Sequence, residues 1–204
     1  SMEKIKLTYF NIEGVAEPIR LAFALAGIEY EDERIAFDQW KDMKPKMPFG
    51  QLPVLTINDG PMQTQSMAML RWVGMMQQQQ QQKQQSSSHS DKSSLLYPVN
   101  DPAAVYKIEE AMGVVEDLRK SWTPCLAMGR APLTYGHPEG FFDTADGQAR
   151  IQQVRELWVR ETFPLYAQQL QGLLAKYNGQ WLASTEAPTI VDCVAVVFLR
   201  GFTK

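Results

Sequence analysis

Three short motifs in the first third of the chain constrain its fold more than any other feature. The strand-like run Leu7–Phe10 carries Tyr9 near its end, Pro53 opens a second apolar run, and Gln65-Ser66 stands where a helical pattern begins. Residues 4–10 alternate in polarity and are rich in β-forming side chains, which predicts a strand. A proline is typical of the first residue of a strand. The chain is therefore expected to begin with an α/β unit.

The other elements of a small α/β domain follow in order. Glu17-Pro18 places proline in the first turn of a helix, and Gly27 stands where a left-handed cap ends it. Asn58-Asp59-Gly60 predicts a turn between two strands. We expect strands over residues 4–10, 30–35, 53–57 and 61–64, and helices over residues 17–27 and 66–74. Strand–helix–strand, then hairpin, then helix is the order of a thioredoxin-like domain, here over residues 1–76.

Residues 77–94 have a different composition. Six consecutive Gln, Lys83, two further Gln and Ser86-Ser87-Ser88 form a low-complexity tract. Such a tract lacks the apolar side chains that offset the entropy of ordering. We interpret it as a mobile linker insert between two domains, into which the preceding helix can fray. A regulatory or aggregation-prone segment and an engineered insert are the alternatives.

The pattern over residues 95–204 is helical, which predicts an all-α C-terminal domain. Apolar residues at steps of three and four form one continuous stripe: Val105, Ile108, Met112, Val115, Leu118 and Trp122. A second helix begins near Ile151, and Pro164 is expected to kink or split it. Thr189 and Asp192 form a capping box at the start of a last, buried helix. We expect this domain to be short at its end, Lys204.

Bulk composition excludes several classes of function. The chain has 204 residues and a net charge of −3, so it carries no basic footprint for nucleic acid. We also expect no membrane partner, because no apolar run is long enough to span a bilayer and no secretory signal pattern is present. Cys125 and Cys193 lie far apart, which predicts neither a disulfide framework nor a metal site. The expected compartment is a reducing cytoplasm.

Tyr9 and Pro53 carry the first candidate chemistry. A phenol at the end of a strand can donate a hydrogen bond to a bound sulfur and so stabilise a thiolate over a thiol. A strand aromatic whose hydroxyl is satisfied elsewhere is the alternative. The Leu52–Pro53 bond is a candidate cis peptide, which would present the Leu52 backbone to a peptide ligand. The alternative is an ordinary trans proline at the start of a strand.

Three further features are suited to charged groups of a ligand. The amides and dipole of the helix that begins at Gln65-Ser66 favour a carboxylate, although a plain Ser N-cap is the alternative. Trp40 and Lys44 share a helical face and can bind a second carboxylate; otherwise they are a core-edge Trp and a solvated Lys. Asp117 lies off the apolar stripe and can meet an ammonium group, or it is a solvated surface carboxylate.

Taken together, these motifs resemble those of cytosolic glutathione transferases, in particular the sigma class, which includes glutathione-dependent prostaglandin D synthases. The resemblance covers residues 3–76 most strongly and extends over residues 95–202 through Val115–Arg119 and the Thr189–Asp192 box. It implies a thioredoxin-like domain followed by an all-helical domain, assembled as a homodimer. It also implies glutathione as co-substrate, with no metal.

The resemblance further implies roles for individual residues. Tyr9 matches the catalytic tyrosine that activates glutathione. The remaining glutathione-binding positions are Trp40, Lys44, Gln51, Leu52, Pro53, Gln65, Ser66 and, reaching across the dimer, Asp117. Phe10, Val15 and Thr123 fall where the electrophile pocket would be lined. Phe49 and Arg71 fall at dimer contacts.

One departure bears on the chemistry. The family motif after the first strand reads Gly-Arg-Ala-Glu, whereas here it is Gly14-Val15-Ala16-Glu17. A cation near the sulfur is therefore missing, which should weaken the polarisation of carbonyls and peroxides. The leading hypothesis is conjugation of glutathione to small apolar electrophiles. A prostaglandin-type isomerase and a non-catalytic, crystallin-like ligand-binding relative are the alternatives.

Overall fold

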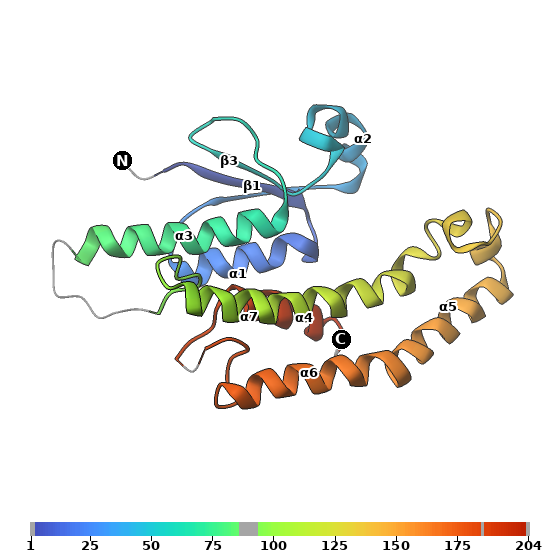
Figure 1. Ribbon diagram of the computed structural model, residues 1–204. Coiled ribbons are helices and arrows are strands. Elements are labelled where there is room, and N and C mark those ends of the chain that lie inside the picture. Colours follow the sequence, from blue (N-terminus) through green and yellow to red (C-terminus); the bar gives the residue numbers. More distant parts are fainter. Residues whose placement is uncertain (1–2, 86–93, 185, 203–204) are drawn as a thin grey trace.

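A mixed three-stranded sheet forms the base of the N-terminal domain in the computed structural model, which describes residues 3–85, 94–184 and 186–202. The strands are β1 (Ile5–Phe10), β2 (Glu31–Ile35) and β3 (Val54–Ile57), in the spatial order β2-β1-β3. β1 pairs parallel with β2 and antiparallel with β3 (Figure 1). The alternating apolar residues of β1 place Leu7 in the core, where it is fully buried.

The expected fourth strand over residues 61–64 is present only as a single bridge. Gln63 exchanges two backbone hydrogen bonds with Leu55, at 2.7 and 3.0 Å, and no ladder extends from them. Pro61 lacks the amide hydrogen that a ladder needs, so pairing cannot continue toward the turn at residues 58–60. The predicted hairpin is correct in position but wrong in its extent.

Two long helices, α1 (Glu17–Ala26) and α3 (Ser66–Gln85), cover one face of the sheet (Figure 1). α1 ends at Gly27, whose φ of 64° confirms the predicted left-handed cap. Ile19, Phe23 and Leu70 are fully buried between these helices and the sheet. Burial of each such side chain contributes about 1.5–3 kcal/mol. The short helices of this domain are η1 (Gly14–Ala16), η2 (Phe37–Gln39), α2 (Trp40–Met43), η3 (Lys44–Lys46) and η4 (Pro48–Gly50).

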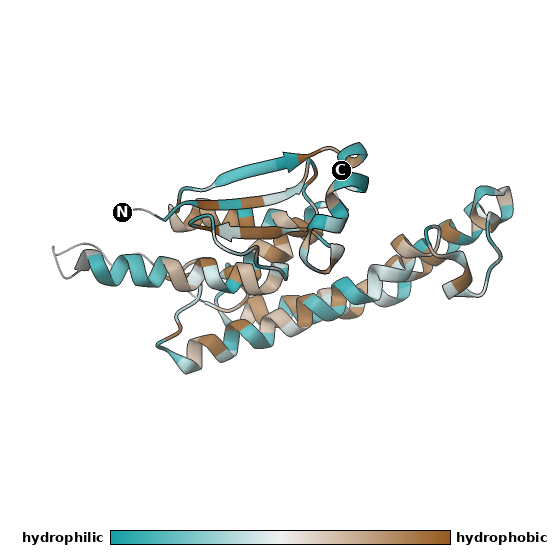
Figure 2. Cartoon of the chain, turned by 90° about the horizontal axis from the view of Figure 1, so that it is seen from above, coloured by the Kyte–Doolittle hydropathy of each residue, from teal (hydrophilic) through white to brown (hydrophobic). Residues whose placement is uncertain are grey.

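The interpretation of residues 77–94 as a linker is wrong at its start, because α3 continues through Gln85. Gln77 and Gln78 are buried. The Gln77 side chain accepts from the Leu96 amide at 2.8 Å, and that of Gln78 accepts from the Val99 amide at 2.8 Å. These bonds satisfy backbone groups of the returning segment and so extend the ordered helix. Figure 2 shows the hydrophilic character of the far end of α3. Residues 86–93 lie outside the described residues.

Helices make up most of the C-terminal region. They are α4 (Pro102–Ala127), η5 (Pro132–Tyr135), η6 (Phe141–Asp143), α5 (Ala145–Leu157), η7 (Trp158–Thr162), α6 (Phe163–Lys176) and α7 (Ile190–Arg200). Asp101 caps α4 by accepting from the amides of Ala103 and Ala104 at 3.1 and 3.0 Å. Within the described ranges, no helix is both long enough and apolar enough to cross a membrane.

Pro164 splits the second long helix, as expected. The five-residue segment η7 has π-helical geometry and connects α5 directly to α6. Because proline has no amide hydrogen and its ring crowds the carbonyl one turn earlier, a wider turn before Pro164 relieves both conflicts. α5, η7 and α6 therefore follow one another without a break, and the helical geometry changes only within η7.

α7 lies between α1 and α4, so the predicted central position of the last helix is confirmed (Figure 1). Ile190, Val191 and Val194 are at most 1% exposed. The Asp192 carboxylate accepts from the Thr189 amide at 2.8 Å, which confirms that half of the capping box. The Thr189 hydroxyl donates to the same carboxylate at 3.0 Å. The thioredoxin-like sheet followed by a helical region confirms the predicted fold class.

Candidate functional site

Tyr9 lies near the end of β1 with its side chain 8% exposed. Its ring meets Phe10 edge to face, with 5.6 Å between ring centroids. The guanidinium carbon of Arg20 lies 6.0 Å from the Tyr9 ring centroid. Within the described part of the chain, no hydrogen bond to the Tyr9 hydroxyl is found. The hydroxyl is thus available to a ligand atom.

The turn that follows β1 approaches the Tyr9 hydroxyl closely. A Cβ atom at Gly14 would lie 2.5 Å from the Tyr9 hydroxyl oxygen, and the φ of Gly14 is +46°. Only glycine meets both conditions without strain. Gly14 therefore lets the backbone of η1 pass directly beside the phenol, and Val15, the next residue, lies on the same turn.

Pro53 lies beside Tyr9 through the strand register. Thr8 of β1 pairs with Val54 of β3, so the next residues in line are Tyr9 and Pro53. The Leu52–Pro53 peptide bond is cis, as predicted. Among the described residues, the backbone amide and carbonyl of Leu52 have no hydrogen-bond partner. An edge backbone of this kind can pair with an extended peptide.

Gln65 and Ser66 reach the same edge of the sheet. The bridge between Leu55 and Gln63 is antiparallel, so the chain beyond Gln63 runs toward the Pro53 end of β3. α3 begins at Ser66, as expected. Gln65 has a φ of 73°, an uncommon value for a residue other than glycine. Its exposed side chain and the first amides of α3 therefore lie at the edge that carries Tyr9.

Trp40 and Lys44 lie at this end of the domain as well. Phe10 connects them to Tyr9, because its ring stacks on Phe37 at 4.6 Å and meets Trp40 edge to face at 5.4 Å. The Lys44 side chain passes over Gly50, where a Cβ atom would lie 3.4 Å from Lys44 Cε. The predicted glutathione-binding residues of the N-terminal domain thus gather around one end of the sheet, next to the exposed Gln51.

The other predicted residues lie apart from this group. Asp117 is exposed on α4, with its carboxylate 3.9 Å from the Lys120 ammonium. Thr123, also exposed on α4, donates to the Arg119 carbonyl at 3.4 Å. Phe49 is 80% exposed, with a φ of 55°. Their roles, and those of Phe10 and Val15 in the electrophile pocket, remain predictions.

Arg71, a predicted dimer contact, forms a bidentate pair with Glu109 of its own chain. Its Nε and Nη2 atoms donate to the two carboxylate oxygens at 2.8 and 2.6 Å. The Tyr97 hydroxyl donates to the same carboxylate at 2.9 Å. The hydrogen bonds from Arg71 hold the pKa of Glu109 below its usual value, and burial raises the pKa of Tyr97.

Sequence reasoning missed Arg20, the buried cation next to Tyr9. Arg20 is 6% exposed and donates to the Ile12 carbonyl at 2.8 Å. It also pairs with Glu17 and Asp32, each at 3.1 Å. The signal in the sequence was an arginine three residues after Glu17 and three before Phe23, on the face of α1 that enters the core.

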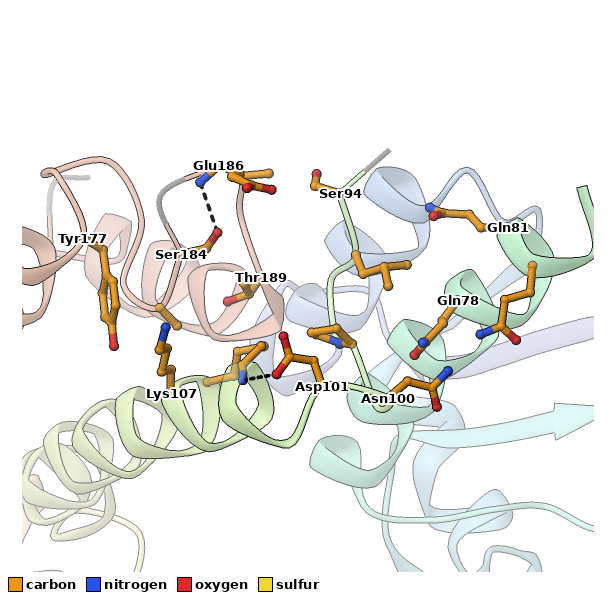
Figure 3. Close-up of a pocket in the computed structure, with 17 residues that line it drawn as sticks. Gln78, Gln81, Ser94, Asn100, Asp101, Lys107, Tyr177, Ser184, Glu186 and Thr189 are labelled. Atoms are coloured by element: carbon orange, nitrogen blue, oxygen red, sulfur yellow. Dashed lines mark hydrogen bonds between the residues drawn. The ribbon is translucent and has the colours of Figure 1, made fainter. Parts of the chain in front are cut away.

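A cavity of about 600 Å³ lies elsewhere, between the end of α3, the start of α4 and the segment before α7 (Figure 3). Its lining includes Gln78, Asp101, Lys107, Tyr177 and Thr189, and none of the predicted glutathione-site residues. This cavity therefore does not coincide with the predicted glutathione-binding residues around Tyr9. We assign the functional site to the Tyr9 edge, because that is where an available hydroxyl, an unpaired backbone and a helix N-terminus converge.

Comparisons with known proteins show what the N-terminal domain is similar to. Residues 5–74 match the family model described as glutathione S-transferase, N-terminal domain. Glutathione S-transferase 1 of Ascaris suum is 48% identical over 73 residues, which are 36% of this chain and 35% of the relative. Hematopoietic prostaglandin D synthase of Gallus gallus is 47% identical over 72 residues, which are 35% of this chain and 36% of the relative. The chain thus matches about a third of the length of these curated relatives.

The likeness of structure extends further along the chain. The crystal structure of the glutathione S-transferase from Ascaris lumbricoides superposes with a TM-score of 0.69 at 26% identity. The match covers 98% of this chain and 80% of that structure. Residues 5–74 thus match the N-terminal domain of glutathione S-transferases, and the fold of the whole described chain is similar to that of the Ascaris lumbricoides enzyme.

Proposed function

We propose that the chain is a glutathione transferase that conjugates the glutathione thiolate to small apolar electrophiles, with the thiolate stabilised by Tyr9. The observation that carries the proposal is the buried Tyr9 phenol, whose hydroxyl lies against Gly14 and has no hydrogen-bond partner among the described residues. Its register beside cis-Pro53 supports it further.

The chemistry needs one nucleophilic step. A free thiol has a pKa near 8.5, and a hydrogen bond donated by Tyr9 to the sulfur favours the ionised form. Lowering the pKa of the thiol by two units would correspond to about 2.7 kcal/mol of preference for the thiolate. The sulfur then donates an electron pair to an electrophilic carbon, a C–S bond forms, and the leaving group departs with its bonding electrons.

The remaining groups of glutathione have matching partners at the same edge. The unpaired Leu52 backbone would form strand-like hydrogen bonds with the cysteinyl unit. Gln65, Ser66 and the N-terminus of α3 would bind the γ-glutamyl carboxylate. Trp40 and Lys44 would bind the glycine carboxylate by hydrogen bonding and charge.

A homodimer would complete the site. In this proposal, Asp117 of the partner subunit binds the γ-glutamyl ammonium, and Phe49 contributes the principal apolar contact between subunits. The 80% exposure of the Phe49 side chain supports an intermolecular role for it. Arg71 would contribute through the Arg71–Glu109 pair, because that pair fixes its orientation.

A prostaglandin-type isomerase is the second candidate. The 47% identity to hematopoietic prostaglandin D synthase of Gallus gallus over the N-terminal domain favours it. Val15 supplies no positive charge beside the sulfur, and polarising a peroxide oxygen calls for such a charge. We therefore propose conjugation as the main activity of the same site.

The test is conjugation of glutathione to 1-chloro-2,4-dinitrobenzene, followed by its absorbance change. Tyr9→Phe should lower kcat/KM by roughly 10²-fold, the scale set by loss of one stabilising hydrogen-bond donor. Tyr106→Phe, at an exposed tyrosine on α4, is the matched control and should leave the rate unchanged. Conjugation no faster than in buffer would contradict the proposal. Faster turnover of a prostaglandin endoperoxide would favour the isomerase.

A further inference from the structure

A side chain at the end of α7 reaches the turn that adjoins Tyr9. Arg200 Nη2 lies 3.3 Å from a carboxylate oxygen of Glu13 and 3.1 Å from one of Glu17. These two acidic residues flank η1, the single turn Gly14–Ala16. One guanidinium from the helical region therefore bridges both ends of this turn of the N-terminal domain.

Glu17 is shared between two arginines. Its Oε1 faces Arg200, and its Oε2 accepts from Arg20 Nη1 at 3.1 Å. The same Nη1 atom donates to the Ile12 carbonyl at 2.8 Å. Arg200 thus contacts the side chains that flank the turn, and Arg20 contacts the backbone that leads into it.

The turn held in this way sets the space around the Tyr9 hydroxyl. Since a Cβ at Gly14 would lie only 2.5 Å from the hydroxyl oxygen, the Gly14 backbone is in close contact with the phenol. A shift of the turn by a few tenths of an ångström would move the Tyr9 hydroxyl. A hydrogen-bond donor must lie about 2.7–3.2 Å from its acceptor, so such a movement would weaken the bond. Val15, on the same turn, would move with it.

We propose that Arg200 is a positioning residue, by which α7 fixes the turn Gly14–Ala16 against the Tyr9 hydroxyl. The inference rests on the proposed function, in which that hydroxyl stabilises the glutathione thiolate. In this proposal Arg200 acts on the turn through Glu13 and Glu17. Both contacts are made by one nitrogen, Nη2, which carries two hydrogens and can donate one to each carboxylate.

The test compares Arg200→Met and Arg200→Lys with Arg160→Met, a control at an exposed ion pair in η7. In glutathione-bound protein, Arg200→Met should raise the pKa of the bound thiol by about 0.5, a roughly threefold loss of thiolate. In Arg200→Lys the rise in the pKa of the bound thiol should be smaller, and in Arg160→Met the pKa should not change. In a Tyr9→Phe background, Arg200→Met should have no further effect, because the positioned hydroxyl is gone.

A second readout does not depend on glutathione. In ligand-free protein labelled with ¹³C in its tyrosine rings, the Tyr9 signal, assigned with Tyr9→Phe, should move in Arg200→Met and stay in place in Arg160→Met. If the pKa of the bound glutathione thiol is not lowered in wild type, the proposed function is overturned. The Tyr9 signal would then still show whether Arg200 positions the Tyr9 ring. An unchanged Tyr9 signal together with an unchanged thiol pKa would overturn the inference alone. If Arg200→Met does not fold, Glu13→Gln removes one of the two contacts and takes its place.

Discussion

The side-chain oxygen of Gln77 accepts a hydrogen bond of 2.8 Å from the backbone amide of Leu96, which joins the second half of α3 to the segment before α4. Both residues are buried, at 5% and 2% exposure. The amide nitrogen of the same Gln side chain donates to the Ser94 carbonyl at 3.4 Å. The first residue of the glutamine run is therefore part of the fold.

Gln77→Ala should destabilise the protein because it leaves the buried Leu96 amide without a partner. The expected loss in the free energy of unfolding is about 1–3 kcal/mol, measured by urea denaturation. Gln79→Ala, at an exposed position of the same run, is the control and should stay within about 0.5 kcal/mol of wild type. Equal stability of the two variants would show that the Gln77 bond contributes nothing.

The Arg71–Glu109 pair should make stability depend on pH. The hydrogen bonds from Arg71 lower the pKa of Glu109 from 4.5. For a carboxyl whose pKa is lower in the folded state, the stabilisation is present above the unfolded pKa and is lost as pH falls through the folded pKa. Glu109→Gln should thus reduce the free energy of unfolding by about 1 kcal/mol at neutral pH, since the pair is partly exposed to solvent.

The difference between wild type and Glu109→Gln should then shrink toward zero in acid, below the folded pKa of Glu109. Urea denaturation at several pH values measures it, with Glu161→Gln as a control at an exposed pair. A difference that persists at low pH would mean that the Glu109 substitution acts through packing and not through the ion pair.

The two cysteines should be unreactive in the folded protein. Cys125 and Cys193 are free thiols and are both buried. Burial raises the pKa of Cys193 to about 12 and also raises that of Cys125, so the nucleophilic thiolate is scarce at pH 8. Ellman's reagent should label neither within minutes in buffer and both after unfolding in guanidinium. Rapid labelling of the native protein would contradict the burial of that thiol.

Phe49 should control assembly if the proposed homodimer forms. Phe49→Ser should shift the mass measured by light scattering from dimer to monomer, because it removes the most exposed of the large apolar side chains described. Leu133→Ser, at a side chain that is 67% exposed in the helical region, is the control and should leave the dimer intact. A monomeric wild type, or a dimeric Phe49→Ser, would contradict the role proposed for Phe49.

Features specified by nearby residues were predictable from the sequence. Gly27 as a left-handed cap and the start of α3 at Ser66 each depend on one or two neighbours, and both were confirmed. The cis bond before Pro53 was expected from the thioredoxin-like order of the motifs, and it too was confirmed. The fourth strand was overestimated, because Pro61 limits pairing to one bridge. The turn signal at residues 58–60 located the hairpin without setting its length.

Features that depend on distant partners were not predictable. The composition around Gln77 indicated a linker. The Gln77 side chain contributes to the fold because it forms hydrogen bonds with the backbone of Ser94 and Leu96. Arg200 and Glu17 lie 183 residues apart in sequence, so no local pattern connects them. Single-sequence reasoning detects local periodicity and turn chemistry, whereas contacts of this kind arise only when the chain has folded.

The proposed mechanism is tested most directly by the ultraviolet absorbance of the glutathione thiolate bound to this protein, titrated with pH in wild type and Tyr9→Phe. The mechanism predicts a pKa for the bound thiol well below the free value of about 8.5, and a return toward that value in Tyr9→Phe. Binding of glutathione with an unshifted thiol pKa in both proteins would contradict it, and would indicate a protein that binds glutathione without activating it.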